Sequence, residues 1–205
     1  MKTDQPVKIY RKDYTPFPYS VESLKLVFQL FDDRTVVQAR TVYAESKERE
    51  GTPEKLFLYG EELDLQSIAV NGVQLNSSEY ELDEKGLQLK VSQNSFTLDI
   101  ETVIYPAQNS SLEGLYRSSG NYCTQCEAEG FRKITYYPDR PDVLTTFTTR
   151  IEADKVQCPV MLSNGNLHET GELADNRHFV VWHDPFAKPC YLFAHVEGQL
   201  VSMND

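Results

Sequence analysis

The sequence predicts an all-β fold of packed, mixed or antiparallel sheets, with the form of a sandwich or a saddle and little helix. Runs in which every second residue is apolar recur along most of the 205 residues, as they do in strands that bury one face. Turn-forming pairs such as Asn-Gly separate these runs at close intervals. The sequence shows no long segment with the apolar period of an amphipathic helix, and short, regularly spaced strands are typical of packed sheets.

The first half of the chain carries the clearest strand patterns. Residues 23–31 place four apolar side chains on one face, with Lys25 and Gln29 on the other. Residues 96–105 alternate in the same way, and Pro106 ends that run because proline has no N–H to donate to a ladder. Further strands are expected in residues 35–43, 55–59, 67–70, 73–75, 80–82 and 87–91. Turns are expected at residues 32–34, 71–72, 83–86 and 164–165.

Residues 107–142 interrupt this alternation. The segment is long for a connection inside a compact domain, and loops of that length are often functional. A short helix is expected at residues 139–144, where Asp139 can cap the first turn and Pro141 suits its first position. Strands are then expected in residues 144–152, 156–162, 178–183 and 190–197.

Composition excludes two classes of partner. The formal net charge is -11, so the surface repels nucleic acid phosphates and anionic membranes. No apolar run approaches the roughly 20 residues that span a bilayer. The first residues are polar and lack the apolar core of a secretory signal. We therefore expect a cytoplasmic protein that binds neither nucleic acid nor membrane.

The histidines and cysteines do not predict a metal site in this chain. Gluzincin peptidases need His-Glu-x-x-His on a helix, but here Glu172 follows His168-Glu169 where the second histidine is required. His178 and His183 lie five apart on an expected strand, so their side chains point to opposite faces. The C-x-x-C formed by Cys123 and Cys126 is half of a possible zinc or redox motif, but reduced, buried thiols are the expectation.

A polar pair and an aromatic group stand out within residues 107–142. Gln125 and Glu127 lie two apart, so an extended backbone places both on one face, where an amide and a carboxylate can bind an ammonium group. A solvated acidic side chain is the competing interpretation. Glu129 has the same parity, and nothing in the local sequence separates it from Glu127. The aromatic residues indicate either a packed core edge or one wall of an apolar pocket, and they are Tyr116, Tyr122, Phe131, Tyr136 and Tyr137.

Three blocks in this segment resemble the aminopeptidase N family, in particular its bacterial branch. Weaker similarity extends from about Tyr14 to Gly198. The blocks are Leu-Glu-Gly-Leu-Tyr at 112–116, Cys-Thr-Gln-Cys-Glu-Ala-Glu-Gly-Phe-Arg at 123–132, and Ile-Thr-Tyr-Tyr-Pro-Asp-Arg-Pro-Asp-Val-Leu at 134–144.

The resemblance implies the N-terminal β domain of a zinc metallo-aminopeptidase that removes N-terminal residues from peptides. It implies that residues 1–198 form this domain, that its loop region 107–142 reaches the active site, and that residues 199–205 begin a linker to a thermolysin-like catalytic domain. In the family, the glutamate of a Gln-x-Glu motif binds the substrate's free α-amino group. That position matches Glu127, and the glutamine matches Gln125. In distant members proline follows this glutamate, whereas Ala128 follows it here.

The resemblance also implies that the zinc cofactor is bound by the catalytic domain. We therefore expect the 205-residue chain alone to have no catalytic residue, no metal ligand and no activity. Two alternatives remain open at this point. One is a stand-alone β-sandwich binding module without catalysis, and the other is a small zinc-ribbon-like protein built on Cys123 and Cys126.

Overall fold

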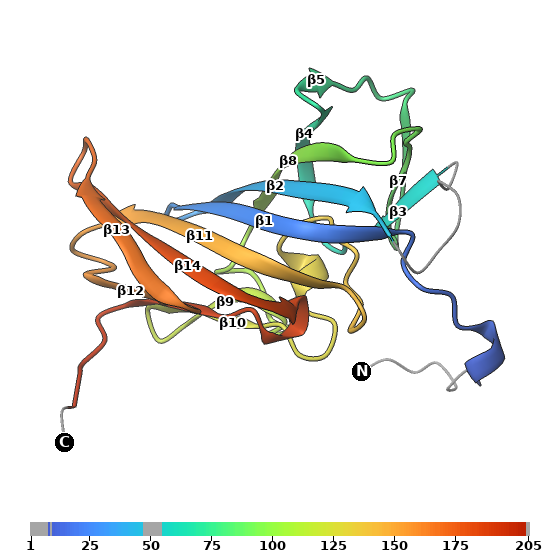
Figure 1. Ribbon diagram of the computed structural model, residues 1–205. Helices are drawn as coiled ribbons and strands as arrows, with labels where there is room; N and C mark the ends of the chain where they lie inside the picture. The colour runs from blue at the N-terminus through green and yellow to red at the C-terminus, as the bar shows by residue number, and fades with distance from the viewer. Residues whose placement is uncertain (1–7, 9, 47–54, 204–205) are drawn as a thin grey trace.

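The computed structural model describes residues 8, 10–46 and 55–203, which fold into three sheets and three short 3-10 helices (Figure 1). Strands dominate, so the predicted all-β class is confirmed. The 3-10 helices are η1 (Arg11–Asp13), η2 (Phe131–Lys133) and η3 (Cys190–Leu192).

The largest sheet has eight strands and is mixed, because β1 and β11 run parallel while the other neighbours run antiparallel. The strands that follow one another across it are β13 (Asn166–Glu172), β14 (Arg177–Pro189), β11 (Leu144–Asp154), β1 (Tyr19–Leu30), β2 (Thr35–Glu45), β8 (Phe96–Ile104), β4 (Asp64–Val70) and β5 (Val73–Gln74).

Two smaller sheets complete the fold. The four-stranded sheet runs in the order β12 (Val160–Ser163), β15 (His195–Gly198), β10 (Asn121–Gln125) and β9 (Gly114–Ser118). The three-stranded sheet runs in the order β3 (Lys55–Tyr59), β7 (Gly86–Lys90) and β6 (Tyr80–Asp83). Figure 1 shows β9, β10 and β12 below the layer formed by β1, β11 and β14.

Strict alternation in the central strands builds the core. In β8, every second residue from Phe96 to Ile104 is buried, and β1, β2 and β11 follow the same rule over most of their length. The buried face of β1 meets the four-stranded sheet, since the ring of Phe28 lies 6.1 Å from that of Phe193 and 4.3 Å from that of His195. Segment 107–142 is therefore held against the same face of the main sheet as β15.

Several predicted boundaries are wrong for identifiable reasons. The strand expected from residue 156 begins only at Val160, because the Asp154 carboxylate accepts hydrogen bonds from the backbone N–H groups of Val156 and Gln157 and forms a turn there. The strand expected from residue 190 is first η3 and then β15. β13 was not predicted, because six of its seven residues are exposed and show no apolar alternation.

The helix expected at residues 139–144 does not form. Residues 141–142 are a turn, and β11 begins at Leu144. The Asp139 carboxylate, expected to cap the helix, instead binds Arg132 and the Cys190 thiol. Both partners lie outside residues 139–144. Because the carboxylate oxygens of Asp139 are bonded to them, no oxygen is available to cap a helix.

Candidate functional site

Strand β10 leads directly into the predicted site, because Gln125 is its last residue and Glu127 follows two residues later. It pairs antiparallel with β9 on one side and with β15 on the other. Thr124 fixes the position of β10 against β15 near the end of the strand. Its hydroxyl donates to the His195 carbonyl (3.1 Å) and accepts from the His195 N–H (2.9 Å). β10 ends at the next residue, Gln125, so the chain leaves the sheet from a fixed position.

The residues after β10 form a tight, exposed turn whose two ends are buried. Gly130 donates its N–H to the Cys126 carbonyl at 2.8 Å and closes the turn. Cys126 and Phe131 are buried, whereas the residues between them, apart from Gly130, are exposed. A Cβ atom on Gly130 would lie 2.2 Å from the Gln125 carbonyl oxygen. The close approach of the two chain segments therefore requires glycine at this position.

Gln125 and Glu127 are both exposed, but the extended backbone assumed from their spacing ends at Gln125 and Glu127 lies in the turn. The side-chain amide of Gln125 donates to the Glu127 backbone carbonyl at 3.0 Å, so the contact between them runs through the main chain and not through the carboxylate. The peptide bond between Glu127 and Ala128 is cis. Over the residues that the structure describes, the Glu127 carboxylate has neither a hydrogen bond nor an ion pair.

Glu129 differs from Glu127 in this respect. One of its carboxylate oxygens lies 3.5 Å from Nη1 of Arg132. The sequence alone could not separate the two carboxylates, because what separates them is the position of a guanidinium three residues away. The turn thus presents one paired acidic side chain and one that is available to a ligand.

A buried ion pair lies at the base of the turn. Arg132 donates from Nε to Oδ2 of Asp139 at 2.9 Å, and the exposed fractions of the two side chains are 10% and 2%. Burial lowers the pKa of Arg132, but the hydrogen bond and charge of Asp139, with the charges of Glu129 and Glu61, raise that pKa by more. The guanidinium is therefore a permanent cation here. The sequence contained no signal for this pair, because both residues are typical of exposed loops.

The aromatic residues of the segment support the structural interpretation. Phe131, Tyr137, Tyr136 and Tyr122 are buried, and Tyr116 is half-buried. The ring of Phe131 contacts that of Tyr137 at 5.2 Å, and it also contacts the aromatic core at Phe193. These side chains hold the segment on the main sheet.

The described residues contain no group of three or more His, Cys, Asp or Glu side chains placed to hold a metal ion. The four cysteines are free, and burial raises the pKa of Cys158 to about 12. His178 and His183 bind separate partners, namely the Cys158 carbonyl at 2.8 Å and the Thr148 hydroxyl at 3.1 Å. This geometry gives no support to the zinc-ribbon hypothesis.

A second buried titratable pair was not predicted from the sequence. His195 and Glu197 lie two apart on β15, both side chains are fully buried, and Nδ1 of His195 bonds Oε1 of Glu197. Burial raises the pKa of Glu197, and the neighbouring His195 opposes that rise. The pair packs beside Phe28, inside the interface of two sheets.

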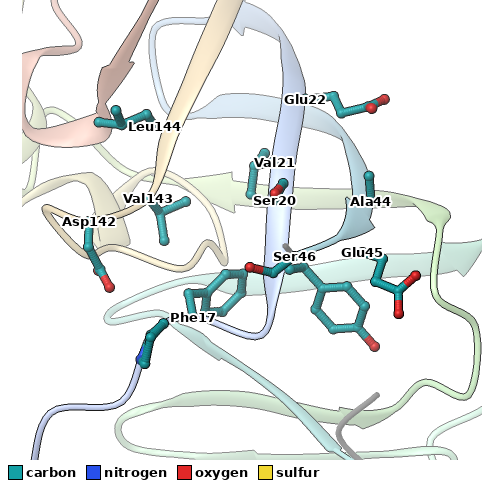
Figure 2. A pocket seen from close by; sticks show the side chains of 12 residues that line it. Phe17, Ser20, Val21, Glu22, Ala44, Glu45, Ser46, Asp142, Val143 and Leu144 are labelled. Atoms are coloured by element: carbon teal, nitrogen blue, oxygen red, sulfur yellow. The ribbon is translucent and has the colours of Figure 1, made fainter. Parts of the chain in front are cut away.

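One cavity lies away from the turn. It measures about 530 Å³ and opens where β1 begins and β2 ends. Figure 2 shows the side chains of Glu22, Glu45 and Asp142 around it, together with Phe17. Neither Gln125 nor Glu127 lines this cavity. The candidate site is therefore an exposed turn and not a closed pocket.

Comparison with known proteins defines the class of protein. The family model described as the Peptidase M1 N-terminal domain matches residues 26–192. Aminopeptidase N of Caulobacter vibrioides is 47% identical over 205 residues, and aminopeptidase N of Escherichia coli is 45% identical over 203 residues. These alignments cover 100% and 99% of this chain, but 23% of each relative. The chain thus spans less than a quarter of the length of these curated relatives.

Solved structures agree with this match. The crystal structure of Legionella pneumophila aminopeptidase A in complex with aspartic acid superposes with a TM-score of 0.88 at 36% identity, covering 93% of this chain and 22% of that one. An M1 zinc metallopeptidase of Deinococcus radiodurans, bound to a Tyr-Ser-Ala substrate, gives a TM-score of 0.75 over 88% of this chain and 42% of that one. At 12% identity, this second likeness concerns the fold alone.

The β-rich fold and the family match define an N-terminal peptidase domain. The chain belongs to the M1 peptidase family and corresponds to its N-terminal domain. No helix among the described residues is long and apolar enough to cross a membrane.

Proposed function

We propose that this domain provides the amine-binding carboxylate of a zinc-dependent aminopeptidase. In this proposal Glu127 binds the free α-amino group of a peptide substrate, and Gln125 holds the main chain of the turn beside it. The observation that carries the proposal is the contrast on one exposed turn: the carboxylate of Glu127 is available, whereas Glu129 is paired with Arg132. The family assignment favours this function over a stand-alone binding module.

The chemistry suits a peptide N-terminus. An α-amino group has a reference pKa of about 7.7–8.0, so much of it is cationic near neutral pH. An ionised carboxylate forms a charge-assisted hydrogen bond with that cation. Such a contact fixes the distance from the substrate's N-terminus to the bond that is cleaved, which aligns the first peptide bond for attack.

Zinc belongs elsewhere in this proposal. The described residues supply no set of ligands for it, so we assign the metal to a thermolysin-like catalytic domain outside this chain and assign no step of hydrolysis to these residues. β15 ends at Gly198, and residues 199–203 have no helix or strand. This boundary supports a domain of residues 1–198 followed by a linker at 199–205. Location in the cytoplasm stays a prediction.

The test compares two neighbouring carboxylates in the longer protein that contains the catalytic domain. Glu127→Gln removes the charge but keeps the shape, and charge-assisted hydrogen bonds contribute about 1.5–3 kcal/mol. We expect kcat/KM for an aminoacyl chromogenic substrate to fall about 10- to 100-fold. The matched comparison, Glu129→Gln, should cost less than Glu127→Gln, because the exposed Glu129 side chain is already paired with Arg132 and exposed ion pairs contribute little.

Two outcomes would contradict the proposal. An unchanged kcat/KM for Glu127→Gln would reject the site while leaving the family assignment intact. Hydrolysis by the 205-residue chain alone, with zinc added, would show that the catalytic chemistry lies within this domain.

A further inference from the structure

The Glu127 carboxylate has no partner of its own among the described residues, so its position depends on the main chain of the turn. That main chain is fixed at one end by the last pairs of β10 and at the other by the residues that follow Gly130. The first residues after Gly130 form η2, which contains Arg132. What holds Arg132 therefore holds the turn.

The Asp139 carboxylate holds Arg132 at two atoms. Its Oδ2 accepts from the Arg132 backbone N–H at 3.2 Å and from Nε at 2.9 Å, and its Oδ1 accepts from the Cys190 thiol at 3.0 Å. Both carboxylate oxygens are thus used, and Asp139 connects η2 with η3. The guanidinium is also held by Tyr59, whose ring centroid lies 4.4 Å from it.

The other end of the guanidinium reaches two further segments. Nη1 lies 3.7 Å from a carboxylate oxygen of Glu61, just after β3, and 3.5 Å from Glu129 in the turn itself. The Arg132 carbonyl also accepts from the Glu61 N–H at 3.0 Å. Arg132 therefore contacts the turn through Glu129, the three-stranded sheet through Tyr59, and Asp139.

A buried ion pair is weak evidence for a stabilising role, because desolvation offsets much of the attraction and apolar replacements are often equally stable. The ion pair is instead directional, because a planar guanidinium matches a carboxylate in only a few orientations. We propose that Arg132 and Asp139 are positioning residues that set where the Glu127 carboxylate stands relative to the substrate. This inference rests on the proposed function of Glu127.

The test is a double-mutant cycle in the longer protein that contains the catalytic domain. Arg132→Lys keeps the charge but loses the fork of donors and the stacking on Tyr59. A displacement of about 1 Å in a positioned group can cost up to about 100-fold, so we expect kcat/KM for an aminoacyl chromogenic substrate to fall about 10-fold. In a Glu127→Gln background the same change should cost less than about 2-fold, because the group that it positions is already removed.

Two variants keep the test independent of folding defects. Cys190→Ala removes only the thiol donor to Asp139, and its smaller loss should also disappear in the Glu127→Gln background. Asp142→Asn is the matched control, because it breaks another Arg–Asp pair of the same segment (Arg140 Nη2 to Asp142 Oδ2, 2.6 Å), and it should leave kcat/KM unchanged.

The outcomes are distinguishable. Loss from Arg132→Lys that disappears in the Glu127→Gln background supports the inference. Losses that multiply, with Glu127→Gln itself effective, overturn the inference and leave the proposed function standing. An ineffective Glu127→Gln overturns the proposed function and this inference together.

Discussion

The main sheet and the segment 107–142 are held in place by different forces. In the sheet, β1, β2 and β8 bury every second side chain over most of their length, and most of these side chains are apolar. In the segment, Arg132, Lys133 and Asp139 are buried together with the aromatic residues. Apolar burial contributes to stability in proportion to area and without direction. Buried charges instead stabilise only the arrangement in which they are paired. In the segment they therefore fix the conformation, whereas in the sheet apolar burial mainly contributes stability.

This difference fits the position of the candidate site. Glu127 lies in the segment, two residues after the end of β10 and four residues before the start of η2. The sheet provides the support for the turn, and the ion pair provides its placement. Comparable substitutions in the main sheet and in segment 107–142 should therefore change the free energy of unfolding by different amounts.

The largest expected effect comes from breaking the ion pair in the 205-residue chain. Asp139→Leu removes the buried counter-ion of Arg132 and leaves only the more exposed carboxylates of Glu61 and Glu129 near its guanidinium. Breaking a buried pair costs about 3–5 kcal/mol. The measurement is the free energy of unfolding in urea. The double variant Arg132→Met with Asp139→Leu should regain most of the loss, because no uncompensated charge remains. A double variant as unstable as the single one would show that both residues are needed for stability itself.

The next effect tests the close approach of two chain segments in the turn. Gly130→Ala places a methyl group 2.2 Å from the Gln125 carbonyl oxygen, so the backbone must shift. Overpacking of this kind costs about 1–3 kcal/mol, measured by urea unfolding. Gly120→Asn is the control, because a Cβ there has nothing within 4 Å and asparagine tolerates positive φ. Equal losses at both glycines would contradict the assigned clash.

A smaller effect is expected for a shape-conserving change in the sheet. Leu26 in β1 is buried among apolar neighbours. Leu26→Met keeps volume and polarity, so it should cost less than about 1.5 kcal/mol in urea unfolding. Arg132→Lys is equally conservative by charge, yet it loses directed contacts and should cost more. A larger loss for Leu26→Met would remove the contrast between the two regions.

The same contrast explains what the sequence could predict. Strands such as residues 23–31 and 96–105 follow from a period of two, which is a local property, and β1 and β8 contain all but the last residue of each range. The position of Asp139 depends on Cys190, which lies 51 positions away. No local pattern reveals such a contact, so the residue was expected to cap a helix that does not form.

The candidate site was predictable in the same partial way. Spacing singled out Gln125 and Glu127 on the assumption of an extended backbone. Both are exposed, but only Gln125 belongs to β10, and Glu127 lies in the turn that follows. Spacing could not distinguish Glu127 from Glu129, since both flank Ala128 in an acidic stretch. The structure distinguishes them through Arg132, whose own position depends on Asp139. The buried pair of His195 and Glu197 carried no local signal either.

The smallest expected effect is a change in pH dependence, and it tests the buried pair of His195 and Glu197 within the sheet interface. Burial raises the pKa of Glu197 above its ordinary value of 4.5, so the folded chain keeps this proton at pH values where the unfolded chain releases it. Glu197 therefore favours folding least at high pH, and stability falls as pH rises from 4.5 through the folded pKa. Glu197→Gln removes this titration.

Urea unfolding of both proteins between pH 4 and pH 8 measures the difference. The free energy of unfolding of the wild type, minus that of Glu197→Gln, should decrease with rising pH across the window that begins at 4.5. Leu26→Met, in β1 of the facing sheet, should show no such trend because neither leucine nor methionine titrates. A difference independent of pH would mean that Glu197 ionises alike in the folded and unfolded chains. Glu197 would then be charged in the folded chain, and His195 would hold that charge in place inside an otherwise apolar interface. The pair would resemble the buried ion pair of Arg132 and Asp139 in this respect.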